Sequence, residues 1–287
     1  MASRYRKQAP EGPNLPARGQ GEAAKGLTPQ AAVRPRASAG RGRSELAQEL
    51  RRGLYATVFR RRDIRHFRPD PVPDAVLGRI LLAAHHAPSV GFTQPWSFII
   101  VRDLELRREV KRVFERERAK NAALFTGARR EQFLSFKLEG ILEAPLNLIV
   151  TCEVGRFGPA VLGKPGTDQV ELYSTCLAVQ NLWLAARAEG LGVGWVSILS
   201  NDALRAIFGI PPEIVPVAYL CIGYAQRFSP RPALEEAGWA PRLPLDEVLK
   251  FEAWGALDNQ RAQALARLAS DPDTWRAIFP HGRIPGF

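Results

Sequence analysis

The chain has few cysteines, a single methionine and no long apolar run, and each shortage excludes a class of protein. Three cysteines, Cys152, Cys176 and Cys221, are too few for a disulfide framework. They show no metal-ligand spacing and each lies in an apolar run, so we expect buried thiols in a reducing compartment. The single methionine argues against a methionine-rich binding surface. No segment approaches the roughly 18 uncharged apolar residues of a membrane-spanning helix.

The sequence also lacks the motifs of several catalytic classes. It contains no G-x-S-x-G motif and no Cys/His nucleophile pattern. His85 and His86 are adjacent, so on a helix their side chains would point about 100° apart and could not ligate one metal. No other acidic residue or histidine has suitable spacing, so we predict no metal site. The N-terminus lacks the apolar stretch of a secretory signal, and we expect a cytoplasmic protein.

Positive charge is in excess, and most of the excess lies in the first 43 residues. The chain carries 40 Lys and Arg against 29 Asp and Glu, a net charge of +11. Residues 1–43 account for +7 of this and the other 244 residues for +4. The segment is rich in Ala, Gly and Pro, and we predict a disordered basic tail that is either a weak tether to an acidic partner or a dispensable extension. Nucleic-acid binding by the folded part is a third functional hypothesis, which this charge distribution disfavours.

Apolar periodicity predicts helices alternating with short buried strands in a domain at 44–256. The expected helices lie at 44–58, 74–87 and 171–189, with two more between 104 and 143 that break near Thr126-Gly127. Continuous apolar runs predict strands at 96–101, 146–152, 193–199 and 215–224. This alternation is typical of an α/β or α+β fold whose central sheet is covered on both faces. Residues 257–287 are expected to form a C-terminal helix and extension.

An arginine-rich motif, Arg61-Arg62-Asp63-Ile64-Arg65, is the first candidate binding site. Arg61 and Arg65 are four residues apart, so they would converge if the turn stays helical, and a forked pair suits a phosphate monoester. The alternative is a solvated basic end that complements the dipole of the preceding helix. A loop arginine between two prolines, at position 242, is either a second anion clamp or an ordinary surface arginine.

Two loop motifs could contact a flat heterocycle. Between Pro88 and Trp96, Ser89 and Gln94 offer hydrogen bonds and Gly91 permits close backbone approach, although the loop could be only a well-specified turn. Residues 190–197 (GLGVGWVS) superficially match G-x-G-x-x-G, but a helix precedes them and a strand follows, which disfavours a Rossmann site. The glycines would instead let backbone pass close to a planar ligand, with a serine reaching it from the strand, or form a plain helix-terminal turn.

In their order along the chain these motifs resemble the nitroreductase-like flavoprotein family, and within it the 5,6-dimethylbenzimidazole synthase branch. The resemblance rests on RRDIR (61–65), PSVGFTQPWSFI (88–99), KLEGI (137–141), LYST (172–175) and the run from VQNLW to GWVSI (179–198). It covers roughly residues 50–255. A typical nitroreductase has Ser or Thr where this chain has Asp63, and usually Asn where it has Gly91 or Phe92.

The resemblance implies a nitroreductase-like α+β fold with a central mixed sheet flanked by helices, in an intertwined homodimer. FMN would lie in clefts at the subunit interface under a helical lid formed by 104–143. Reduced FMN would be the substrate, fragmented with O2 to 5,6-dimethylbenzimidazole, the lower ligand of vitamin B12, and erythrose 4-phosphate. A separate flavin reductase would supply the reduced FMN. An NAD(P)H-dependent FMN nitroreductase or quinone reductase is the alternative.

The same resemblance implies two catalytic residues. Asp63 would be a general base, the alternative being a pure ion-pair partner of the arginines. Ser197 would exchange a proton or hydrogen bond at the flavin or oxygen, the alternative being a core strand hydroxyl. The expected contacts to FMN are Arg61, Arg62, Asp63, Ile64, Arg65, His85, Ser89, Gly91, Gln94, Leu172, Val193, Gly194, Ser197 and Arg242.

Overall fold

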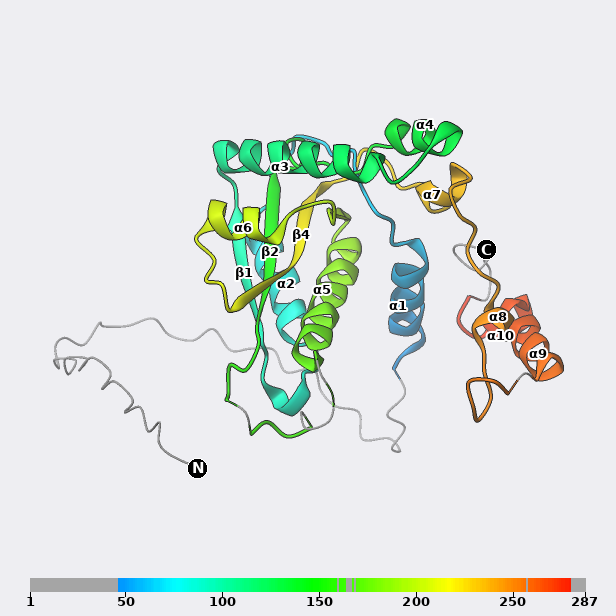
Figure 1. Ribbon diagram of the computed structural model, residues 1–287. Coiled ribbons are helices and arrows are strands. Elements are labelled where there is room, and N and C mark those ends of the chain that lie inside the picture. Colours follow the sequence, from blue (N-terminus) through cyan, green and yellow to red (C-terminus); the bar gives the residue numbers. More distant parts are fainter. Residues whose placement is uncertain (1–45, 159, 164–166, 168, 257, 280–287) are drawn as a thin grey trace, which may run out of the picture. The chain divides into compact units, whose positions relative to one another are not determined.

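The computed structural model describes residues 46–158, 160–163, 167, 169–256 and 258–279 (Figure 1). The predicted tail at 1–43 and its junction at Ser44 lie outside these residues. The strands are β1 (Trp96–Val101), β2 (Leu146–Glu153), β3 (Leu191–Trp195) and β4 (Ile214–Tyr224). The helices are α1 (Gln48–Arg60), α2 (Asp74–His85), η1 (Val90–Phe92), α3 (Leu104–Ala122), α4 (Gly127–Ser135), α5 (Val170–Ala188), α6 (Asn201–Phe208), α7 (Ala233–Glu236), α8 (Leu245–Val248), α9 (Asn259–Ser270) and α10 (Pro272–Arg276).

Most predicted elements are confirmed, with two differences near the candidate site. Helix α6 was not predicted, although its ends carry ordinary signals: the Ser200 side chain accepts a hydrogen bond from the Ala203 amide, and Gly209 ends the helix at φ 62°. Strand β3 covers 191–195 instead of 193–199. Ser197 therefore lies beyond the strand and not within it.

The sheet has the order β1-β2-β4-β3, and each neighbouring pair is antiparallel. Across the part of the chain that the structure describes, the mixed character predicted for the sheet is confined to one isolated parallel bridge, between Asp63 and Val193. This bridge joins the arginine-rich motif to the edge strand β3. The sheet edge therefore positions the candidate site.

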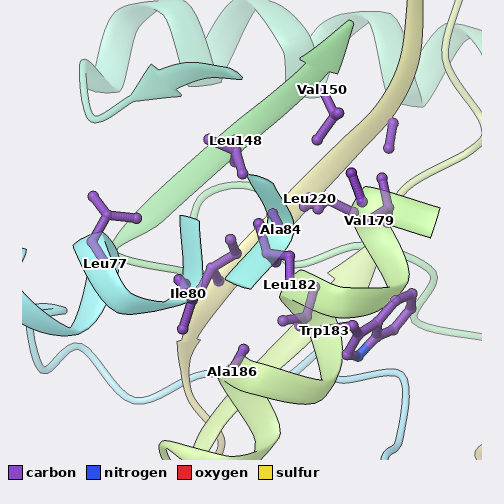
Figure 2. Packing of buried hydrophobic residues seen from close by; sticks show 14 of the residues in the cluster. Leu77, Ile80, Ala84, Leu148, Val150, Val179, Leu182, Trp183, Ala186 and Leu220 are labelled. Atoms are coloured by element: carbon purple, nitrogen blue, oxygen red, sulfur yellow. The ribbon is translucent and has the colours of Figure 1, made fainter. Parts of the chain in front are cut away.

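Both faces of the sheet are buried, as the continuous apolar strands predicted. Successive residues of a strand point to opposite faces. Leu148 and Leu220 point towards α2 and α5, where they join Leu182 in one core (Figure 2). Ile149 and Tyr219 point to the opposite face and join a second core. Full burial of a side chain of this size contributes about 1.5–3 kcal/mol, so the two cores hold the strands in register.

Several apolar side chains of the predicted helices lie on the surface. Cys152 and Cys221 are buried, but Cys176 is exposed, so the prediction of three buried thiols was wrong for this one. Helix α5 is apolar on nearly every side, whereas only one side can face the sheet, which leaves Tyr173 and Leu177 exposed as well. Helix α1 shows the predicted spacing of apolar side chains, yet Leu50 is 60% exposed. None of the described helices is long and apolar enough to cross a membrane.

Candidate functional site

Arg61, Asp63 and Arg65 lie together directly after α1. The helix ends at Arg60, and Arg61 is already extended, with φ −61° and ψ 135°. In extended chain, alternate residues point to the same side. The Asp63 carboxylate accordingly lies 3.6 Å from Arg61 Nη1 through one oxygen and 3.6 Å from Arg65 Nη2 through the other. The predicted convergence of the arginines is present, but an extended segment produces it and not a helical turn.

The next residue, Ile64, fastens this segment to β3. Its amide donates a hydrogen bond to the Val193 carbonyl at 3.0 Å, and its side chain is buried. A Cβ atom added to Gly194 would lie 2.1 Å from the Ile64 carbonyl oxygen, and one added to Gly192 would lie 2.7 Å from Ile64 Cγ1. The chain's own arginine-rich segment therefore lies against these glycines, and their contact with a planar ligand stays a prediction.

Two neighbouring tryptophans complete the setting of the arginines. The Arg61 guanidinium lies 5.0 Å from the ring centre of Trp183, within the range of a cation–π interaction. Arg65 Nη2 donates to the Trp195 carbonyl at 2.9 Å. The Asp63 side chain is 54% exposed, so a ligand can reach the carboxylate. Two arginines against one carboxylate leave positive charge in excess, which suits a phosphate monoester.

Arg62 points away from this group and serves the structure. Its guanidinium donates to the carbonyls of Phe59 and Arg61 at the end of α1, and to those of Ser229 and Pro230 in the loop after β4. Burial lowers the pKa of Arg62, and the positive charges of Arg61 and Arg242 lower it further. Arg242 is therefore close enough for its charge to affect the Arg62 guanidinium, while its own side chain is exposed.

The Pro88–Trp96 loop forms a second polar group. Ser89 Oγ accepts from the Gln94 amide at 3.0 Å, and Gln94 Nε2 donates to the Phe92 carbonyl at 2.7 Å. Three residues have positive φ, namely Gly91 at 51°, Phe92 at 56° and Gln94 at 44°. This is uncommon for residues other than glycine, so the loop is held in a strained shape. A Cβ atom on Gly91 would lie 2.5 Å from Val161 Cγ1, so here too close packing explains the glycine.

His85 lies at the base of this loop. Its Nδ1 accepts a hydrogen bond from Trp96 Nε1 at 3.2 Å, which leaves Nε2 as the protonated nitrogen of the neutral ring. The side chain is exposed, and Leu172 in the first turns of α5 is half-buried. Their predicted contacts to FMN stay predictions. The described residues contain no group of three His, Cys, Asp or Glu placed to hold a metal ion.

The two groups contact different parts of α5. The Val90 amide binds Ser174 Oγ at 3.1 Å, whereas Arg61 lies over Trp183. These two positions on α5 are nine residues apart, which corresponds to about 13 Å along the helix axis. Ser197 is exposed just beyond β3, so its interpretation as a core strand hydroxyl was wrong.

The sequence interpretation missed the tryptophans that support the arginines. Trp183 was assigned only to an apolar helix, and its spacing does not distinguish a core residue from a platform for a guanidinium. Trp195 supports Arg65 through its backbone carbonyl oxygen, and a pattern of side chains cannot predict a backbone contact. No helix or strand was predicted for the segment that contains Trp239.

The family model described as Nitroreductase family matches residues 58–224 of this chain. The chain belongs to the nitroreductase family. The family match contains the arginine-rich segment, the strained loop and all four strands. Arg242 lies outside it.

Two relatives of this nitroreductase-family chain carry the name 5,6-dimethylbenzimidazole synthase, which marks the chain as an enzyme. That of Rhodospirillum rubrum is 43% identical over 195 residues, covering 68% of this chain and 92% of that protein. That of Rhodobacter capsulatus is 39% identical over 200 residues, covering 69% and 97%. A crystal structure of oxidized iodotyrosine deiodinase bound to FMN and 3-iodo-L-tyrosine is similar with a TM-score of 0.56 at 25% identity, covering 70% of this chain and all of that one.

Proposed function

We propose that the protein is a 5,6-dimethylbenzimidazole synthase, which converts reduced FMN and O2 to 5,6-dimethylbenzimidazole and erythrose 4-phosphate. The 43% identity to the Rhodospirillum rubrum enzyme, over 92% of its length, supports the assignment. The observation that carries it in the structure is the exposed Asp63 carboxylate held 3.6 Å from each of two arginines. A carboxylate inside a phosphate-binding group suits a reaction at the sugar-alcohol arm next to that phosphate.

The arginines bind the phosphate end of FMN in this proposal. Trp183 orients Arg61, and the Trp195 carbonyl orients Arg65. Little side-chain freedom therefore remains to be lost when the phosphate binds. Arg242 approaches from the loop after α7. Ser89, Gln94 and the end of β3 contact the ring system.

When bound, reduced FMN supplies both the electrons for O2 and the carbon skeleton of the product. The chain's own contribution is proton transfer and position. Asp63 takes a proton from the arm of the substrate, and the neighbouring arginines keep its carboxylate close to that arm. The Ser197 hydroxyl, exposed beyond β3, exchanges a hydrogen bond or proton at the ring. Residues 104–143 form the lid that excludes water from the bound flavin.

A second copy of the chain completes each site in this proposal. The two groups of predicted flavin contacts are about 13 Å apart along α5. Helix α5 also presents the exposed apolar side chains of Tyr173 and Leu177, which a partner's surface would cover. A homodimer packed on α5 brings the arginine group of one copy towards the polar loop of the other.

The direct test supplies reduced FMN and air to the purified protein. Mass spectrometry should find 5,6-dimethylbenzimidazole, with erythrose 4-phosphate as the second product. Chemically reduced FMN and FMN reduced by an added flavin reductase should both serve, whereas NAD(P)H alone should not. Steady NAD(P)H oxidation without 5,6-dimethylbenzimidazole would instead identify a nitroreductase or quinone reductase.

A further inference from the structure

Trp239 forms a contact that the proposed chemistry does not explain. It follows α7, where the chain reverses at Gly238 with φ 66° and the Trp239 amide donates to the Leu234 carbonyl at 2.8 Å. The half-buried indole packs edge-on against Phe125 and Phe136, with ring centres 5.4 Å apart in each pair. Both phenylalanines belong to the lid, on either side of α4.

A lid arginine closes over the same indole. The Arg129 guanidinium lies 3.3 Å from the ring centre, and its Nη2 donates to the Trp239 carbonyl at 2.8 Å. Gln132 Nε2 donates to the Ala237 carbonyl at 2.8 Å. Aromatic and cation–π contacts of this kind are favourable, so they hold the indole against the lid. Helices α4 and α7 are thereby joined side by side (Figure 1).

The clamped segment leads directly into the loop that carries Arg242. Arg242 lies three positions after Trp239, a span of at most about 11 Å. At the other end of the segment, Arg62 binds the carbonyls of Ser229 and Pro230, and the Arg187 guanidinium lies 3.9 Å over the Phe228 ring. The segment from 228 to 239 is therefore fixed at the arginine-rich motif and again at the lid.

We propose that Trp239 is a positioning residue, which holds Arg242 within reach of the FMN phosphate by clamping its loop against α4. This rests on the proposed site, but on its binding step alone. Lid placement and phosphate recognition then depend on each other. Loss of the indole frees the loop, and Arg242 no longer has a fixed approach to the phosphate.

The test measures how much the phosphate contributes to binding, as the ratio of the dissociation constants of riboflavin and FMN for the full-length protein. Arg242→Ala should lower this ratio about tenfold, the loss of one charge-assisted contact. Trp239→Ala should lower it by a similar factor, and Trp239→Phe should restore most of it. The double variant should fall no further than Arg242→Ala alone.

Trp254→Ala is the matched control, because Trp254 is 87% exposed and lies after the clamped segment. It should leave the ratio unchanged. Arg129→Gln removes the guanidinium from the indole but keeps every aromatic ring, so it tests the clamp if Trp239→Ala does not fold, and should lower the ratio about threefold. An unchanged ratio in Arg129→Gln and in any folded Trp239→Ala, or additive losses in the double variant, would overturn the proposal.

Binding and product formation separate the two proposals. If FMN binds better than riboflavin but yields no 5,6-dimethylbenzimidazole, the proposed function fails while the role of Trp239 is still decided by the ratios. If the parent protein binds FMN no better than riboflavin, no phosphate recognition exists to be positioned, and the inference about Trp239 is overturned whatever the reaction.

Discussion

The Ile64 carbonyl oxygen lies so close to Gly194 that a Cβ atom added to this glycine would stand 2.1 Å from it. The missing side chain is what allows the arginine-rich segment to lie on β3. Because the neighbouring atom is backbone, it cannot move aside without shifting Asp63 and Arg65 as well. The geometry of the candidate site thus depends on a residue that need not touch the ligand.

Gly194→Ala should therefore destabilise the protein and weaken FMN binding together. Overpacking of this kind costs about 1–3 kcal/mol in the free energy of unfolding, and displacement of the arginines should reduce affinity at least tenfold. Denaturant unfolding and flavin titration measure the two effects. Gly78→Ala is the control. Gly78 lies on the exposed side of α2, where an added Cβ meets nothing within 4 Å, so this substitution should raise the free energy of unfolding by about 0.5–1 kcal/mol.

Asp63→Asn and Ser197→Gly should leave FMN binding within about threefold of the parent while removing most 5,6-dimethylbenzimidazole formation. The amide keeps the shape of the carboxylate but cannot act as a base, and glycine removes the hydroxyl. General acid–base groups typically contribute about 10²–10⁴-fold in rate, so product yield should fall by that order. Full activity in both variants would defeat the assigned roles.

Leu177→Glu should convert the proposed dimer to monomers. Leu177 is 46% exposed on α5, and a carboxylate there would have to lose its water in a covered interface. Light scattering after gel filtration measures the mass. Leu265→Glu is the control on α9, where the leucine is 43% exposed, and it should remain dimeric. A parent protein that is monomeric at micromolar concentration contradicts the proposed shared site.

Cys221→Ala should reduce the loss of folding stability at alkaline pH. Burial raises the pKa of Cys221 from 9.0 to about 12. The unfolded chain thus loses this proton near pH 9 while the folded chain keeps it, so stability is intact below pH 9 and declines as the pH rises towards 12. One such group contributes a slope of about 1 kcal/mol per pH unit, which the variant should lack. Denaturant unfolding between pH 8 and 11 measures it.

The local elements were largely predictable because their causes are local. The apolar run of β1 and the break between the two charged helices at Thr126-Gly127 appear in the structure where the sequence placed them. Helix α6 could have been found from Ser200 and Gly209, because these two capping residues flank a helix of eight residues. Strand β3 was misplaced because a continuous apolar run does not mark its own ends.

Which side of an element is buried was not predictable in the same way. Periodicity showed that α1 has an apolar stripe, and composition showed that α5 is apolar nearly all round. Neither says which surface meets the sheet. Leu50 and Cys176 are exposed because the facing elements pack on other sides of their helices.

The order of residues by itself determined the elements, the two-sided sheet and the set of residue types that suits a phosphate monoester, since these follow from spacing and composition. Only the tertiary structure decided how those residues meet. An extended segment places Asp63 between two arginines, and the same segment packs against the glycines of β3. Trp239 packs against the lid. Such contacts join parts of the chain far apart in sequence, and no local preference encodes them.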